Sequence, residues 1–119
     1  MQGLHLTADL RGCSGEPAAM THPERLQALC LQAVAAAQLQ PVGQLFHRFP
    51  APGGVTGVVL LAESHLAVHT WPELGAVTLD VFVCNQHTDN SARAEALLAA
   101  LKAAFSPSEA VHHRIERSL

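Results

Sequence analysis

Twelve consecutive residues near the middle of the chain carry most of its chemically reactive side chains. They are Ala62-Glu63-Ser64-His65-Leu66-Ala67-Val68-His69-Thr70-Trp71-Pro72-Glu73. The apolar runs 58–61 and 76–83 flank them, so hydroxyl, imidazole, indole and carboxylate groups lie among strand-like residues. Burying such groups costs free energy unless they are paired. This segment is therefore the first candidate for a functional site.

The residue types alone allow three interpretations of this segment. His65, Ala67, His69 and Trp71 share one parity on a strand, so they form an ordinary half-polar face in the plainest interpretation. His65 and His69 also have the spacing of a metal-binding pair on a helix, but on a strand they lie about 13 Å apart. Ser64 beside His65 suggests a nucleophile and its base, although the G-x-S-x-G turn typical of hydrolases is missing. No metal site is predicted, and hydrolysis by a catalytic triad fits the pattern poorly.

The composition argues against several classes of protein. The chain has 119 residues, a formal net charge of −3 and 49% hydrophobic residues, which predicts one domain over residues 1–119. A nucleic-acid-binding protein would show a basic face, and a membrane-bound one a polybasic or long apolar run. No signal peptide is predicted, and three widely spaced cysteines without a Cys-x-x-Cys motif make a disulfide framework unlikely. We therefore expect no nucleic-acid or membrane partner and a cytoplasmic location.

Hydrophobic periodicity predicts the elements that must position the reactive side chains. Alternating or continuous apolar runs predict strands over residues 3–10, 42–49, 55–62, 65–71, 76–84 and 111–115. Helical spacing predicts one helix that begins at Thr21 and ends near Ala37. Thr21 and Glu24 would form a capping box at its start. A second helix is predicted from the cap residue Asn90 to Phe105.

The order β-α-β-β-β-β-α-β, with short connections between the central strands, predicts the α+β class. We expect a two-layer sandwich in which an antiparallel sheet carries both helices on one face. The other face would expose His, Thr, Asp, Phe and Cys side chains, and a second copy of the chain could cover it. Ser64 and His69 are five residues apart and point to opposite faces of an unbroken strand, which predicts a bend or a bulge near Ser64.

The sequence resembles the small prokaryotic S-adenosylmethionine decarboxylases, which are pyruvoyl-dependent proenzymes. The resemblance rests on the string E-S-H-x-x-x-H-T-W-P-E at residues 63–73, the run that precedes it from Gly54, and Cys84 eleven residues after it. It extends to residues 3–6 and 46–49, and so covers nearly the whole chain. Membership would imply an αββα dimer in which two sheets pack face to face, with the active sites at the interface.

The resemblance also implies that the chain cuts itself between Glu63 and Ser64. The products would be a β chain of residues 1–63 and an α chain of residues 64–119. The Ser64 hydroxyl would attack the Glu63 carbonyl, and elimination followed by loss of ammonia would leave a pyruvoyl group. The pyruvoyl carbonyl would form a Schiff base with the substrate and accept the electrons released by decarboxylation.

Further site residues carry over from the family by position. His69 would be the base that assists processing, and Cys84 would be the acid that protonates the substrate carbon. Phe49 and Trp71 would stack on the adenine, and Glu73 would bind the ribose hydroxyls. Aromatic faces suit both a flat base and a sulfonium cation.

Two features depart from the commonest family pattern. Thr56 stands where the family often has a serine that supports processing, and the loop over residues 49–56 is one residue longer. We expect decarboxylation of S-adenosylmethionine to the aminopropyl donor for spermidine synthesis, by a homodimer of cleaved protomers. The alternatives are a pyruvoyl-dependent ornithine or arginine decarboxylase on the same fold, and an unprocessed regulatory paralogue.

Overall fold

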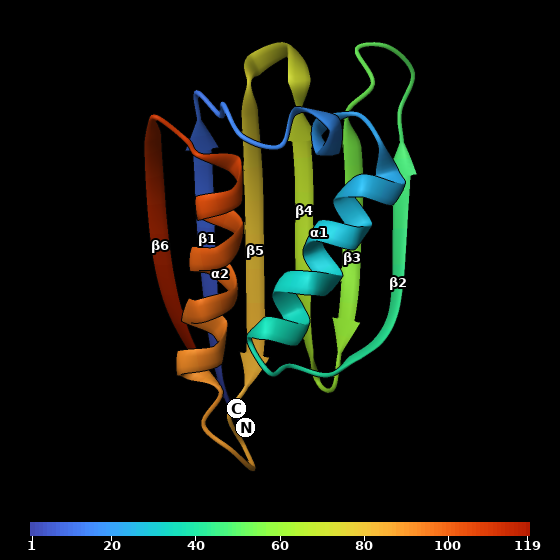
Figure 1. The fold of residues 1–119 in the computed structure, drawn as a ribbon. Helices are drawn as coiled ribbons and strands as arrows, with labels where there is room; N and C mark the ends of the chain where they lie inside the picture. Colours follow the sequence, from blue (N-terminus) through green and yellow to red (C-terminus); the bar gives the residue numbers. More distant parts are fainter.

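A six-stranded antiparallel sheet carries two helices on one face in the computed structural model, which describes residues 1–119 (Figure 1). The strands are β1 (Gln2–Arg11), β2 (Pro41–Arg48), β3 (Val55–Leu61), β4 (Ser64–Trp71), β5 (Ala76–Cys84) and β6 (Glu109–Ser118). The helices are α1 (Pro23–Ala36) and α2 (Ser91–Phe105), with short 3₁₀ turns η1 (Pro17–Met20) and η2 (Pro72–Leu74). This arrangement confirms the predicted α+β class, the order of the elements and the placement of both helices.

The strands lie in the order β2-β3-β4-β5-β1-β6, and every neighbouring pair is antiparallel. Strands β2 to β5 follow chain order because each is joined to the next by a short turn. The two helices make the longer connections, α1 between β1 and the β2 edge, and α2 between β5 and the β6 edge (Figure 1). Strand β1 therefore lies inside the sheet, between β5 and β6, although it begins the chain.

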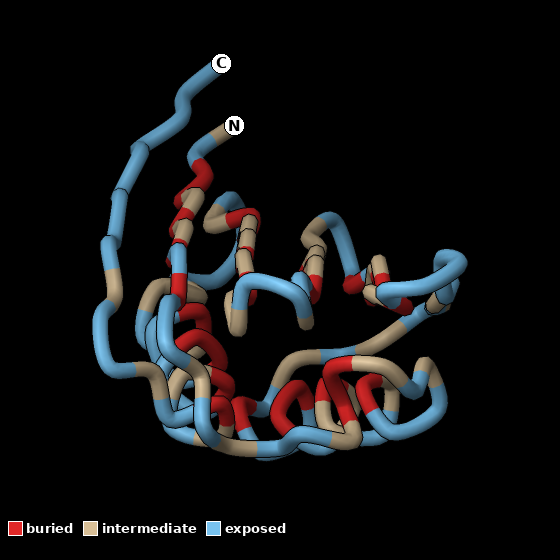
Figure 2. Tube along the Cα trace, turned by 90° about the horizontal axis from the view of Figure 1, so that it is seen from above, coloured by how far each residue is buried: buried red, intermediate tan, exposed pale blue.

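The core lies between the sheet and the helices. Strand β4 shows how the sequence builds it, because Leu66, Val68 and Thr70 are buried while the alternate residues are only half-buried. Leu101 and Phe105 on α2 are fully buried against the same layer. Figure 2 shows the buried residues gathered between the two layers, whereas no helix covers the other side of the sheet. That second side is called the open face below.

Most strand ends agree with the sequence-based prediction to within one residue, but the cap of α1 and the length of β6 do not. The capping box at Thr21 is wrong, since α1 begins at Pro23 after His22, and no side chain caps it. Thr21 instead ends the turn η1, and its hydroxyl lies 3.1 Å from Nδ1 of His22. Pro23 suits the first helical position because it needs no partner for a backbone N–H.

Strand β6 is the second difference, with ten residues where five were predicted. Most of its residues are exposed, so burial imposed no alternation that sequence analysis could detect. Its backbone pairs with β1 over the whole length, from Gln2 opposite Ser118 to Arg11 opposite Glu109. Arg114 of β6 also contacts Glu95 of α2 at 2.9 Å.

Candidate active site

The bond between Glu63 and Ser64 lies at the tight turn that joins β3 to β4. Glu63 has a φ of 53°, in the left-handed region that residues other than glycine rarely adopt. Ser64 is the first residue of β4, and the pairing of β4 with both neighbours runs without a register shift. The predicted bend or bulge in the strand is therefore absent: Ser64 pairs with Leu61 in regular register and faces the opposite side of β4 from His69.

The end of β5 holds the Ser64 side chain. The backbone N–H of Cys84 donates a hydrogen bond of 3.0 Å to Oγ of Ser64. The Cys84 thiol is free and buried, and its Sγ lies 3.9 Å from Oε2 of Glu63. A small hollow of about 120 Å³ borders this group and is lined by Ala62, Glu63, Cys84, His87, Thr88 and Asn90. Glu63, Ser64 and Cys84 are called the serine cluster below.

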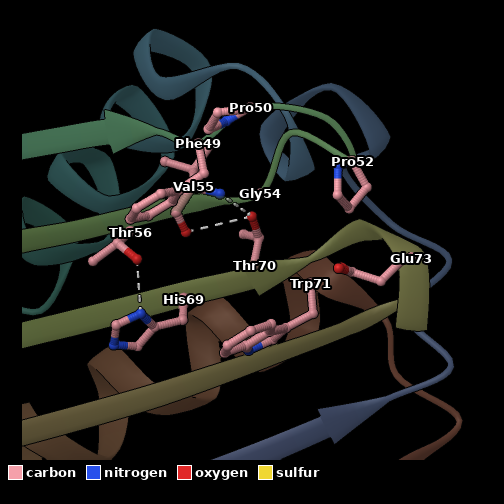
Figure 3. A pocket seen from close by; sticks show the side chains of 10 residues that line it. All are labelled: Phe49, Pro50, Pro52, Gly54, Val55, Thr56, His69, Thr70, Trp71 and Glu73. Carbon is pink, nitrogen blue, oxygen red and sulfur yellow. Dashed lines mark hydrogen bonds between the residues drawn. The ribbon is translucent and has the colours of Figure 1, made fainter.

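The other five predicted residues lie together in a second place. A cavity of about 280 Å³ is lined by Phe49, Pro50, Pro52, Gly54, Val55, Thr56, His69, Thr70, Trp71 and Glu73, whose side chains are drawn in Figure 3. The Phe49 and Trp71 side chains are 50% and 43% exposed, so both rings present apolar surface to a ligand. Oγ1 of Thr56 lies 2.9 Å from Nδ1 of His69. Phe49, Thr56, His69, Trp71 and Glu73 are called the pocket cluster below.

Thr70 fixes the backbone around this cavity, and sequence analysis did not single it out. Its hydroxyl donates to the Met20 carbonyl at 2.7 Å and accepts from the Val55 N–H at 2.8 Å. Gly54 packs so closely that an added Cβ would lie 2.6 Å from the Thr70 carbonyl oxygen. The Phe49 N–H donates to the Gly54 carbonyl at 2.9 Å and closes the loop. These contacts attach the loop before β3 to the end of β4.

The serine cluster and the pocket cluster lie at opposite ends of the sheet. His69 is opposite Thr78 on β5, whereas Ser64 bonds to Cys84 at the far end of that strand. Six residues separate Thr78 from Cys84, which corresponds to roughly 20 Å along the strand. The structure therefore brings the eight predicted residues into two groups and does not join the groups within one chain.

Between the two clusters, the open face carries polar and aromatic groups at its centre. His65 stacks on Phe82 with ring centroids 5.7 Å apart, and His5 lies 3.3 Å from Asp80 in a contact whose geometry is not that of a hydrogen bond. Burial lowers the pKa of His65, and the nearby positive groups His5 and Arg117 lower it further against the opposing effect of Asp80.

Apolar side chains surround this polar centre. Leu45, Leu60 and Ile115 are 71%, 50% and 50% exposed, and each occupies a register position of the open face. An uncovered sheet face of this kind is typical of a surface that associates with another protein layer. No group of three or more His, Cys, Asp or Glu side chains is placed to hold a metal ion. No helix has the length and apolar character that a membrane crossing requires.

Comparisons with known proteins agree with one another. A family described as S-adenosylmethionine decarboxylase matches residues 4–118. The S-adenosylmethionine decarboxylase proenzyme of Archaeoglobus fulgidus is 36% identical over 115 residues, which cover 97% of this chain and 96% of that protein. The corresponding proenzyme of Pyrococcus furiosus is 34% identical over 104 residues, covering 87% of this chain and 73% of the relative.

Solved structures give the same result for the fold. The crystal structure of the adenosylmethionine decarboxylase from Aquifex aeolicus superposes with a TM-score of 0.86 at 32% identity, covering 98% of this chain and 91% of that one. A Trypanosoma brucei AdoMetDC monomer shares the fold at 11% identity, with a TM-score of 0.61 and 44% of its own length covered.

Proposed function

The chain belongs to the S-adenosylmethionine decarboxylase family, and from this premise we propose that it cleaves itself at Glu63–Ser64 and decarboxylates S-adenosylmethionine. The product would be the aminopropyl donor for spermidine synthesis. The observation that carries the proposal is the position of Ser64, directly after a residue at φ 53° and with its hydroxyl held by the Cys84 N–H. The alternatives of ornithine or arginine as substrate, and of an unprocessed paralogue, find no support among the relatives.

Self-cleavage requires only groups of this chain and water. The Ser64 oxygen attacks the Glu63 carbonyl carbon, and the C–N bond breaks to leave an ester. Loss of the Ser64 α-proton then breaks the Cβ–Oγ bond, which releases Glu63 as a carboxylate and leaves dehydroalanine. Tautomerisation and hydrolysis of that residue give ammonia and the pyruvoyl group. The Cys84 N–H suits both stages, because it donates to the oxygen that attacks and then departs with the carboxylate.

The residues around Ser64 fit the cofactor that the family implies. Ser64 supplies its carbon skeleton, and the hollow beside it is bordered by Glu63 and Cys84. A pyruvoyl carbonyl provides an electron sink for the carbanion left when an amino acid loses carbon dioxide. The buried Cys84 thiol supplies a proton to the substrate carbon, as a positioned general acid.

The pocket cluster suits an adenosyl substrate. The exposed faces of Phe49 and Trp71 offer stacking surfaces for adenine, and the Glu73 carboxylate can accept hydrogen bonds from ribose hydroxyls. The same faces attract the sulfonium charge. The His69 imidazole, held beside Thr56, is the base assigned to processing.

A homodimer would join the two clusters into complete sites. In such a dimer, the two-fold axis would lie between the stacked sheets and be perpendicular to their strands. This symmetry places the strands of one copy antiparallel to those of the other. The serine cluster of one chain then faces the pocket cluster of the other, across a sheet separation of about 10 Å. The exposed Leu45, Leu60 and Ile115 would be buried in this packing. A cavity of about 280 Å³ in one chain also lies near the lower limit of ligand sites, which a second sheet would enlarge.

We also propose a cytoplasmic location, which the free state of all three cysteines supports. One of them, Cys30, is fully buried in α1. Burial raises the pKa of its thiol to about 12. Such a thiol is poorly nucleophilic and has a packing role.

Intact-mass spectrometry of the purified protein tests self-cleavage. The wild type should give two fragments that correspond to residues 1–63 and 64–119, and Ser64→Ala should remain one chain of 12.6 kDa. Carbon dioxide release from S-adenosylmethionine, ornithine and arginine then tests the substrate. A single 12.6 kDa species after long incubation of the wild type would refute self-cleavage. Release from ornithine or arginine alone would refute the substrate.

A further inference from the structure

The position of the Ser64 hydroxyl depends on where the backbone of β5 ends. The last residue pair between β4 and β5 joins His65 to Phe82. Beyond that pair the Cys84 N–H donates to the Ser64 side chain instead of to a strand carbonyl. Any displacement of the Cys84 backbone would therefore move the N–H that directs the Ser64 hydroxyl.

The Asn90 side chain holds the next peptide unit, which is joined to the donor N–H through the Cα of Cys84. Its Nδ2 donates to the Cys84 carbonyl at 2.9 Å, and its Oδ1 accepts from Nη1 of Arg93 at 2.8 Å. The Asn90 N–H donates to Oδ1 of Asn85 at 2.7 Å. Asn90 also lines the hollow that Glu63 and Cys84 border. Both side-chain atoms and the backbone N–H of Asn90 are thus engaged close to the serine cluster.

The orientation of Asn90 is unusual for its position in the chain. It directly precedes α2, where an asparagine normally turns its side-chain oxygen to a backbone N–H of the first helical turn, and that cap was predicted from the sequence. The structure shows no such bond from Asn90, so the predicted side-chain cap is wrong. Oδ1 of Asp89 accepts from the Ser91 N–H at 3.0 Å instead. Asp89 therefore caps the helix, which leaves the Asn90 amide free to bind Cys84.

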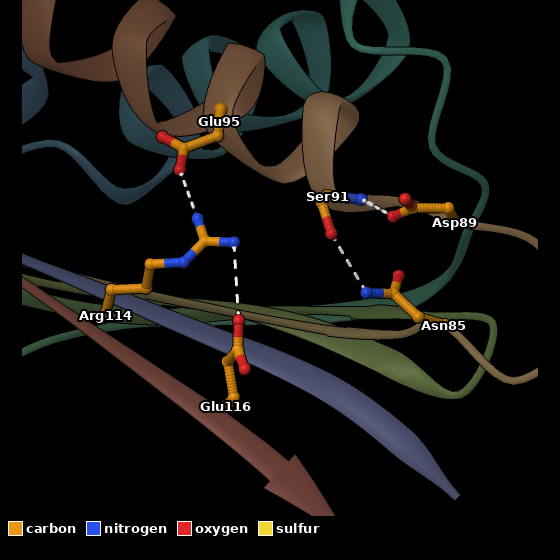
Figure 4. Close-up of polar contacts among 6 residues, drawn as sticks. All are labelled: Asn85, Asp89, Ser91, Glu95, Arg114 and Glu116. Atoms are coloured by element: carbon orange, nitrogen blue, oxygen red, sulfur yellow. Dashed lines mark hydrogen bonds and ion pairs between the residues drawn. The ribbon is translucent and has the colours of Figure 1, made fainter.

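The loop between β5 and α2 is fixed at both ends. The Asn85 N–H donates to the Gln2 carbonyl of β1 at 2.8 Å. Nδ2 of Asn85 donates to Oγ of Ser91 at 3.0 Å, and Figure 4 shows this bond beside the Asp89–Ser91 bond at the start of α2. The Cys84 carbonyl is therefore attached through Asn90 to a helix end that is itself hydrogen-bonded to β1 through Asn85.

We propose that Asn90 is a positioning residue for self-cleavage: it holds the Cys84 carbonyl and so fixes the backbone of Cys84, whose N–H directs the Ser64 hydroxyl. This inference rests on the proposed function. Loss of the Asn90 amide donor would leave the Cys84 carbonyl without this partner. The backbone of Cys84 would then be held less firmly, and its N–H would direct the Ser64 hydroxyl less well. A loss of about tenfold in cleavage rate corresponds to one hydrogen bond of ~1.4 kcal/mol.

Cleavage time courses of the full chain, followed by intact mass, test the proposal with two variants and a matched control. Asn90→Ala and Asn90→Asp should each slow cleavage by about tenfold. Asp89→Ala weakens the same helix end without touching Cys84, and should cleave at close to the wild-type rate. Melting temperatures of all three variants, measured in the uncleavable Ser64→Ala background, separate lost stability from lost positioning.

Asn90→Asp gives a second readout that a purely structural role would not change. An ionised carboxylate repels the Cys84 carbonyl, whereas a protonated carboxyl can donate to it. The cleavage rate relative to wild type should therefore rise as the pH is lowered from 7 towards 5, since the ordinary carboxyl pKa is about 4.

The possible results distinguish failure of the positioning role from failure of the proposed function. Wild-type cleavage rates for Asn90→Ala, or slowing of Asp89→Ala by the same factor, would overturn the positioning role and leave the proposed function intact. A flat rate ratio for Asn90→Asp across the pH range would also overturn it. A wild-type protein that never cleaves would overturn the proposed function and this inference together.

Discussion

Thr56 and His69 form the most direct side-chain contact among the residues assigned to processing. Their polar atoms lie 2.9 Å apart, on neighbouring strands at paired positions. Nδ1 of His69 is therefore engaged, which leaves Nε2 as the nitrogen available to exchange a proton. The chain has threonine where serine is common in the family, and the structure shows that the hydroxyl still reaches the ring.

Replacing Thr56 should reveal what this hydroxyl contributes. Thr56→Val keeps the shape and removes the contact with His69, so cleavage should slow by about tenfold, the effect of losing one hydrogen bond. Thr56→Ser keeps the hydroxyl and should cleave within about threefold of the wild-type rate. Intact-mass time courses measure both. Equal rates for the valine and serine variants would remove Thr56 from the processing machinery.

His65 should make stability depend on pH. Its pKa is lowered in the folded chain, first by burial and then by the charges of His5 and Arg117. The unfolded chain therefore binds more protons near pH 6, and the free energy of unfolding should fall as the pH drops through about 6.5. Urea unfolding of the Ser64→Ala protein at several pH values measures this fall. His65→Gln should reduce this dependence on pH. If the variant loses stability with pH as the parent protein does, His65 is not its cause.

Strand alternation allowed most elements to be predicted, because burial of one sheet face imposes a period of two on β1, β4 and β5. β6 was underestimated, since its exposed side chains follow no such period and only its backbone pairing with β1 defines it. The start of α1 was misjudged because Thr21 bonds its neighbour His22. Local polar contacts of this kind compete with the cap that the sequence pattern indicates.

Thr70 shows how a single buried hydroxyl joins separate elements. It connects β4 to β3 through Val55 and to η1 through Met20. Thr70→Val should lower the free energy of unfolding by about 1–3 kcal/mol, because the buried Val55 N–H would lose an acceptor. Thr78→Val, on the open face of β5, is the matched control and should change stability by less than about 0.5 kcal/mol. Urea unfolding at one protein concentration, in the Ser64→Ala background, compares the two.

The division of the site into two clusters is a property of the whole molecule. Antiparallel pairing places the start of β4 beside the end of β5, and the end of β4 beside the start of β5. Ser64 and His69 are close in sequence, but they lie near opposite ends of β4 because the strand is extended. In the proposed dimer, a second chain completes each site.

Mixing two inactive variants tests this sharing of sites. Ser64→Ala lacks the cofactor precursor but has an intact pocket cluster, and Glu73→Gln has the reverse defect. Co-expression should restore up to about one quarter of wild-type decarboxylase activity, since half of the dimers are mixed and each mixed dimer has one complete site. Each variant alone serves as the control. No recovery from a demonstrably mixed dimer would place each site within one chain.

The sequence by itself determined the alternation of the strands, the layered fold and the types of residue that carry the chemistry. These are local properties, because side-chain burial on a strand or helix follows the order of residues. Only the tertiary structure decided that the Cys84 N–H binds the Ser64 hydroxyl, that Thr70 anchors the loop before β3, and that the eight predicted residues form two clusters. Such relations depend on strand register and loop contacts between residues far apart in the chain, which no local pattern records.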